Sequence, residues 1–224
     1  MKKIFGWCVL VVMTFVFSSC SMMNTSIPRY SNGEQLKENS AIFLSFTKSK
    51  RLLNKNLIIH NNETILFNIE NVDTQEKLQI WKRVCTKKSF GPLVSLFTEV
   101  KEDQINGDNI CGNLFVAELE HGKYKVNSIN LRTYDEDKGL ILTSIYYKPE
   151  NELIFSLHEN EILYLGNIHL ISISQLLSGS IIDVIIGVKD SYKYDKSILV
   201  KEFSSLSEYK TINKTMYLPP KRFK

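Results

Sequence analysis

The chain has 224 residues, of which 43% are hydrophobic and 23% are charged. This composition is typical of globular proteins and excludes a chain that is disordered throughout. The net charge of +4 at pH 7 includes Lys2 and Lys3, and the other basic clusters are short and scattered. We therefore expect no nucleic acid among the partners of this protein.

The N-terminus has the three parts of an export signal. Lys2 and Lys3 precede an apolar run from Ile4 to Phe17, and two serines follow before Cys20. The run is shorter than the roughly 20 residues that a membrane-spanning helix needs. We interpret residues 1–19 as a cleaved signal peptide.

The residues before Cys20 indicate how the mature protein is anchored. Phe17, Ser18, Ser19 and Cys20 resemble the lipobox of bacterial lipoproteins, which signal peptidase II cleaves before a diacylated cysteine. The family usually has an aliphatic residue at the position of Phe17. The resemblance implies that Cys20 is acylated and that the lipid bilayer is a partner. Ser21, which is not Asp, implies by the same resemblance an outer-membrane lipoprotein, on the periplasmic face or the cell surface.

The rest of the chain divides into a tether, one domain and a tail. Residues 20–39 are polar after Cys20 and show no hydrophobic period, so we expect a flexible tether. Residues 40–218 contain many short apolar runs separated by Asn, Asp, Gly and Glu. Such runs predict a mainly β fold, either an antiparallel β-sandwich or a partly open barrel. A short helix is expected at Asp195–Phe203, with Asp195 as its cap. The segment "PLVSLFTEV" fits a helix or a strand, and residues 219–224 are expected to form a basic tail.

Two segments are predicted to form β-hairpins. Residues 114–131 turn near Gly122, and residues 153–170 turn near Glu159 and Asn160. The first resembles a hairpin of transthyretin-like and carboxypeptidase-regulatory-like β-sandwich modules, with His121 in place of a proline. The second resembles an element of uncharacterised Gram-negative envelope lipoproteins, with Asn160 in place of a glycine. Both resemblances imply a β-sandwich, in which Tyr124, Tyr164 and Gly166 are packing and turn residues.

Cys85 and Cys111 are the two remaining cysteines of the mature chain. Exported proteins lie in compartments that oxidise thiols, so we expect a disulfide between them, with two buried thiols as the alternative. Neither cysteine has a partner at the spacing of a zinc site, and no metal or other cofactor is expected.

No local motif of catalysis accompanies the histidines or serines. His60, His121, His158 and His169 each stand alone, and His158 differs from the others in having Glu159 and Glu161 beside it in a predicted turn. Two S-x-x-K patterns, Ser45–Lys48 and Ser207–Lys210, lack the other motifs of penicillin-binding proteins. The acidic turn Tyr134–Gly139 does not have the spacing of an EF-hand loop.

We therefore predict a lipoprotein with a non-enzymatic binding or scaffold domain that contributes to envelope assembly or contacts another envelope protein. Exposed sheet edges and basic turns are the surfaces that such a domain would use. One alternative is a small envelope hydrolase with a site assembled from distant residues, with His158 or His121 as base. The other is a lipocalin-like carrier of an apolar ligand.

Overall fold

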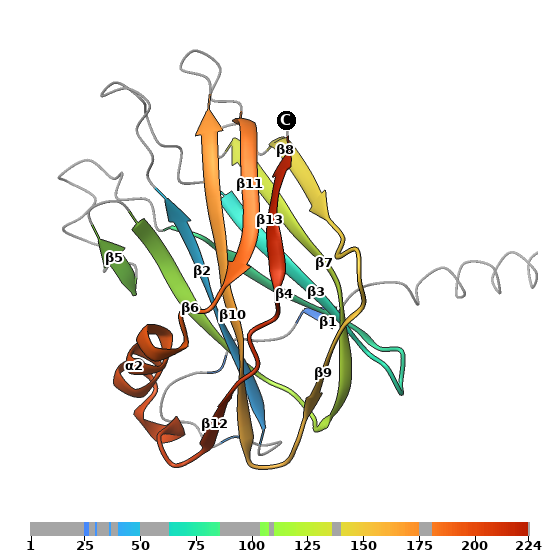
Figure 1. Cartoon of the computed structure of the whole chain (residues 1–224), viewed down its shortest axis with the longest axis vertical. Helices are drawn as coiled ribbons and strands as arrows, with labels where there is room; N and C mark the ends of the chain where they lie inside the picture. Colours follow the sequence, from blue (N-terminus) through green and yellow to red (C-terminus); the bar gives the residue numbers. More distant parts are fainter. Residues whose placement is uncertain are drawn as a thin grey trace, which may run out of the picture.

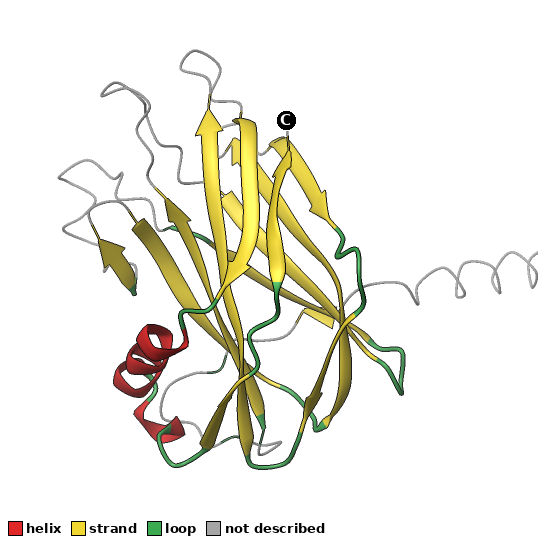
Figure 2. Cartoon of the chain, in the orientation of Figure 1, coloured by secondary structure: helices red, strands yellow, loops and turns green. Residues whose placement is uncertain are grey.

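The structure is a computed structural model, and it describes residues 25–26, 30, 36, 40–49, 63–85, 104–107, 110–135, 140–174 and 181–223. Two β-sheets pack face to face in these residues (Figures 1 and 2), which confirms the predicted β-sandwich. The strands of the first sheet, sheet A, are β1 (Thr25–Ser26), β4 (Lys77–Arg83), β3 (Glu63–Asn71), β7 (Gly122–Asp135), β8 (Leu140–Tyr147) and β9 (Leu153–Leu157), which pairs with β7.

The second sheet, sheet B, contains the strands that are most deeply buried. Its strands are β13 (Leu218–Phe223), β11 (Ile181–Lys189), β10 (Glu161–Ser174), β2 (Ala41–Ser49), β6 (Ile110–Glu118), β5 (Ile105–Gly107) and β12 (Lys210–Asn213), which pairs with β10. Both sheets are mixed, because β2 and β12 run parallel to β10 and β1 runs parallel to β4. The apolar runs predicted strands but do not encode the direction in which two strands pair.

The apolar side chains form two buried clusters on opposite faces of sheet B. Ile42, Leu44 and Phe46 of β2 point between the sheets, toward residues such as Phe67 of β3. The alternate residues Ala41 and Phe43 of the same strand belong to the second cluster. Because both faces of β2 are covered, this strand is a continuous apolar run and not an alternating one.

The second cluster is covered by the helix α2 (Tyr192–Glu202) and the short 3₁₀ helix η2 (Ser204–Leu206). Figure 1 shows α2 beside β6 on the outside of the sandwich. The helix begins three residues before the predicted start, and Ser191 occupies the N-cap position. The prediction that Asp195 caps the helix is therefore wrong, because this side chain is buried against sheet B.

The two predicted hairpins are connections between the sheets. Strands β6 and β7 belong to sheets B and A, and β9 and β10 belong to sheets A and B. The turn at Glu159 and Asn160 does form, with Asn160 at a φ of 62°, and Gly122 starts β7 at a φ of 159°. A tight turn followed by apolar alternation fits a hairpin and a sheet-to-sheet connection equally well, so the sequence could not distinguish them.

The ends of the predicted domain also pack on the sandwich. Thr25 and Ser26 form β1, and Tyr30 and Leu36 are buried in the second cluster, so these described residues of the expected tether lie against the domain. Residues 219–223, expected as a basic tail, belong to β13, which pairs antiparallel with β11. The prolines at 219 and 220 are tolerated because β13 is the edge strand of sheet B.

A bulge in β10 depends on Gly166. The pairing of β10 with β2 shifts between Tyr164 and Asn167, and Gly166 adopts a φ of 117°. A Cβ atom at this position would lie 2.5 Å from Cγ1 of Val188. We predict that Gly166→Ala lowers the free energy of unfolding by about 1–3 kcal/mol, because it adds a steric clash to a backbone conformation that L residues rarely adopt. Urea denaturation measures this, and a variant as stable as the wild type would contradict it.

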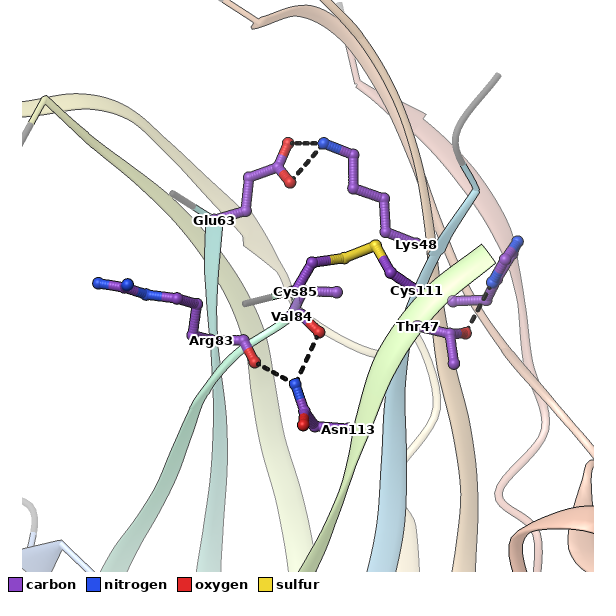
Figure 3. The surroundings of a disulfide bond; sticks show 9 residues. Thr47, Lys48, Glu63, Arg83, Val84, Cys85, Cys111 and Asn113 are labelled. Carbon is purple, nitrogen blue, oxygen red and sulfur yellow. Dashed lines mark hydrogen bonds and ion pairs between the residues drawn. A yellow bond between two sulfur atoms is a disulfide. The ribbon is translucent and has the colours of Figure 1, made fainter. Parts of the chain in front are cut away.

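Three contacts cross from one sheet to the other at the same end of the sandwich (Figure 3). Cys85, which follows β4, forms a disulfide with Cys111 of β6, with a Cα–Cα distance of 5.6 Å. Beside it, Nζ of Lys48 in β2 lies 2.7 Å and 2.5 Å from the two carboxylate oxygens of Glu63 in β3. Asn113 of β6 donates to the carbonyl oxygen of Val84 at 3.2 Å. The disulfide confirms the predicted pairing of the cysteines.

Candidate functional site

A groove lies where two edge strands from different sheets end side by side. It has a volume of about 860 Å³, and its lining includes residues of β9 from sheet A, of β12 from sheet B and of the segment after β12. Its apolar lining is supplied by Leu153, Phe155, Leu163, Ile212 and Met216. This volume is within the range of ligand-binding clefts in proteins.

Each wall of the groove is a sheet edge that is paired on one side. Strand β9 pairs with β7, and β12 pairs with β10. Within the described residues, neither β9 nor β12 has a second strand partner. Unpaired N–H and C=O groups along a sheet edge favour the addition of another strand. Two exposed apolar side chains, Ile154 (45% exposed) and Tyr217 (79% exposed), also line the groove.

The polar lining of the groove includes residues that could take part in catalysis. Ser156 and His158 line it, together with Glu152, Glu161 and Lys214. Glu161 forms an ion pair with Lys210 at 3.1 Å. The backbone N–H of Glu161 donates to the carbonyl oxygen of His158 at 3.3 Å. Among the described residues, no hydrogen bond joins the His158 side chain to Ser156 or to either glutamate. A nucleophile and its base are recognised by such a bond, so the groove has the residue types of a hydrolase site without the contact between them.

A buried polar cluster lies beneath α2. Oδ2 of Asp195 accepts hydrogen bonds from Ser45 of β2 and Tyr164 of β10, each at 2.5 Å, and Asp195 is fully buried. Burial raises the pKa of the Asp195 carboxyl, and the two hydroxyl donors partly offset this effect. Burial and the charge of Asp195 raise the pKa of Tyr164. The cluster holds the first turn of α2 against sheet B.

The Asp195 cluster gives a prediction for stability and its pH dependence. Asp195→Ala leaves two buried hydroxyls without their acceptor, so we predict a loss of about 2–4 kcal/mol in the free energy of unfolding. Asp195→Asn keeps an oxygen acceptor and should lose less. Burial favours the neutral carboxyl in the folded state, so its folded pKa lies above the unfolded value of about 3.9.

The favourable contribution of that neutral carboxyl is complete below about pH 3.9 and is lost as the pH rises through the folded pKa. Lys189, which opposes the shift, and Asp190, which adds to it, are unchanged in both proteins. Wild-type stability should therefore fall relative to Asp195→Asn as the pH rises from 4. Urea midpoints measured over this range test the prediction, and parallel curves for the two proteins would contradict it.

A second polar chain crosses the outer face of sheet B. Nδ1 of His169 lies 2.8 Å from Oγ1 of Thr47, and Nε2 lies 2.9 Å from Oγ of Ser49. Thr47 donates to Oδ1 of Asn167 at 2.6 Å, so its oxygen accepts from Nδ1–H and Nε2 accepts from Ser49. Burial and the nearby charge of Lys189 lower the pKa of His169 to about 4. The imidazole is thus neutral but a weak base. In a Ser–His–Asp triad a carboxylate accepts the hydrogen bond from the histidine Nδ1–H, whereas here the hydroxyl of Thr47 accepts it.

The other predicted site residues are separated in the structure. Ser45 and Lys48 point to opposite faces of β2, so the first S-x-x-K pattern does not form a site. His121 is exposed in the connection between β6 and β7, and His158 in the connection between β9 and β10. Phe17, Ser18, Ser19, Cys20, His60, the segment "PLVSLFTEV" and most of the acidic turn Tyr134–Gly139 lie outside the described residues.

No cluster of three or more His, Cys, Asp or Glu side chains that could hold a metal ion occurs in the part of the chain that the structure describes. Over the same residues, no helix is both long and apolar enough to cross a membrane.

Comparisons with known proteins leave the relationships of this chain open. No family model and no curated protein matches it. Among solved structures, a leucine-rich repeat protein from Bacteroides thetaiotaomicron aligns with 58% of this chain at 14% identity and a TM-score of 0.28. The alignment covers 14% of that protein's chain. A similarity this low supports no argument about the fold or the function.

The sequence reading identified one residue of the groove and missed most of the others. His158 was distinguished by its acidic neighbours and does line the groove with Glu161. Ile212, Lys214 and Met216 carried no signal, because they become part of the groove only when β12 pairs with β10. The buried role of Asp195 was missed because an Asp before a helical pattern is also the signature of an N-cap.

Proposed function

We propose that this chain is a membrane-anchored envelope lipoprotein whose β-sandwich is a non-enzymatic binding module. The acylated Cys20 holds it in the outer membrane, and another envelope protein binds in the groove between β9 and β12. The single observation that supports the binding role is a groove whose walls are sheet edges without a second strand partner among the described residues. The proposal of an anchor rests on the sequence of Phe17, Ser18, Ser19 and Cys20.

The groove has the properties of a surface that accepts a peptide. Its lining combines apolar side chains with a few charged ones, and its walls can donate and accept main-chain hydrogen bonds. Main-chain pairing supplies affinity in such complexes, and side-chain contacts supply specificity. The carrier alternative requires a cavity between the sheets, and in the described residues that space holds the apolar side chains of the first cluster.

The proposed function is tested in cells by affinity purification after chemical crosslinking, with Cys20→Ala as the unanchored control. Incorporation of labelled palmitate is measured in the same cells. We expect labelled wild-type protein and a reproducible envelope partner, and we expect both to be lost in the control. An unlabelled wild-type protein would contradict the anchor, and a labelled protein without a specific partner would contradict the binding role.

The hydrolase remains the second candidate because Ser156 and His158 line the same groove. This candidate predicts that the purified protein reacts with a serine-directed phosphonate probe and that Ser156→Ala and His158→Ala each abolish the reaction. Labelling that persists in both variants, or that does not occur in the wild type, would exclude a site at these residues.

A further inference from the structure

The wall of the groove formed by β9 is acidic at both ends. Glu150 and Glu152 precede the strand, and Glu159 and Glu161 follow it. Lys221 lies 3.5 Å from Glu150, and Lys210 lies 3.1 Å from Glu161. Glu152 and Glu159 have no ion-pair partner among the residues that the structure describes. An exposed carboxylate without an ion-pair partner among the described residues therefore lies at each end of β9.

In the middle of the same wall, buried apolar side chains alternate with exposed side chains along β9. Leu157 is buried, as is Phe155, which stacks on Tyr124 with a centroid distance of 5.5 Å. Ile154 and Ser156, which alternate with them along β9 and also line the groove, are exposed. A strand added beside β9 would continue this alternation, because the side chains of paired strands at the same level lie on the same face. Its inward side chains would reach the groove above Leu163 and Met216.

We infer that the groove binds an extended peptide segment that pairs with the free edge of β9 and has basic residues on both sides of an alternating apolar core. This inference rests on the proposed function and specifies the chemistry of the partner. The apolar core matches β9, and the basic residues match Glu152 and Glu159. The recognition mode is the addition of a strand to a sheet edge.

Charge distinguishes this occupant from a second copy of the chain. Pairing of β9 with the β9 strand of another copy would bring the same glutamates together from both sides, and like charges across an interface oppose association. On the opposite wall, Lys210 already pairs with Glu161 of its own copy and so does little to reduce this repulsion. Lys214, which lines the groove, lies on the segment after β12 and not on β9. A basic-flanked peptide meets no such repulsion on β9.

The charge requirement is tested by selecting short random peptides from a display library on the purified full-length lipoprotein in detergent. We expect peptides with alternating apolar residues and Lys or Arg at both ends. The double variant Glu152→Lys with Glu159→Lys should select acidic ends. Glu76→Lys, at the exposed turn between β3 and β4, is the matched control and should select the same peptides as the wild type. Selection that does not respond to the double variant would overturn the inference.

The pairing requirement is tested with one selected peptide made in two forms, each N-methylated at alternate backbone nitrogens. A paired strand points alternate N–H groups toward β9, so one form should lose at least about tenfold in affinity while the other changes by less than about twofold. Equal losses would contradict pairing with β9. If no peptide is selected and the protein sediments as a dimer, a second copy occupies the edge and the inference fails. The labelling and the cellular partner test the proposed function separately.

Discussion

Lys48→Met is expected to lower the free energy of unfolding by about 3–5 kcal/mol, because it removes one member of a buried ion pair and leaves the other charge in the core. The side chains of Lys48 and Glu63 are 5% and 3% exposed, and they connect β2 of sheet B to β3 of sheet A. Little water reaches the Glu63 carboxylate, so solvent does not replace the ammonium group that the substitution removes.

The double variant Lys48→Met with Glu63→Leu separates the charge effect from the packing effect. Replacing both partners by apolar side chains of similar size is often neutral or stabilising, so the double variant should recover most of the stability that the single variant loses. Equilibrium urea denaturation of the wild type, the single variant and the double variant measures both values. A single variant that loses less than about 1 kcal/mol, the typical value of an exposed pair, would contradict a buried pair.

Removal of the disulfide is expected to lower the free energy of unfolding by about 3.5 kcal/mol. The crosslink joins residues separated by 26 positions, and a loop of this length gives that value when its closure entropy is lost from the unfolded chain. The effect should appear in the double variant Cys85→Ala with Cys111→Ala of the mature chain, whose one other cysteine, Cys20, is proposed to be acylated and then has no thiol that can exchange.

The native protein should also have a mass lower by two hydrogens than its reduced form. Thiol titration after denaturation without reductant tests the bond directly, and two reactive thiols from Cys85 and Cys111 would contradict it. Reduction of the wild type should lower its urea midpoint to that of the double alanine variant.

The sequence predicted the class of the fold because that property depends on local patterns. Short β-branched and aromatic runs between turn residues predicted a sandwich, and the spacing of Ile198, Leu199 and Phe203 predicted a helix in the right place. The partners of each strand could not be predicted. Alternation in β7 and β10 is the same whether the preceding turn closes a hairpin or crosses to the other sheet, and the structure has the crossing in both cases.

The candidate site was less predictable than the fold because its walls are the edge strands of two different sheets. Which strands remain unpaired depends on the complete order of both sheets, and the parallel pairing of β12 with β10 joins segments 49 residues apart. The disulfide could be predicted because the expected export of the chain would place Cys85 and Cys111 in a compartment that oxidises thiols. The ion pair of Lys48 and Glu63 could not be predicted, since a lysine at the end of an apolar strand is usually exposed to solvent.

The central claim is that another envelope protein occupies the groove beside β9, and site-specific photocrosslinking in cells tests it most directly. A photoreactive amino acid replaces Ile154 in the groove or, as the matched control, Val200 on α2; both side chains are 45% exposed. The account predicts a discrete crosslinked partner from position 154 that is absent from position 200 and is lost when Glu152 and Glu159 are replaced by lysine. No adduct at position 154, or the same adduct at both positions, would contradict it.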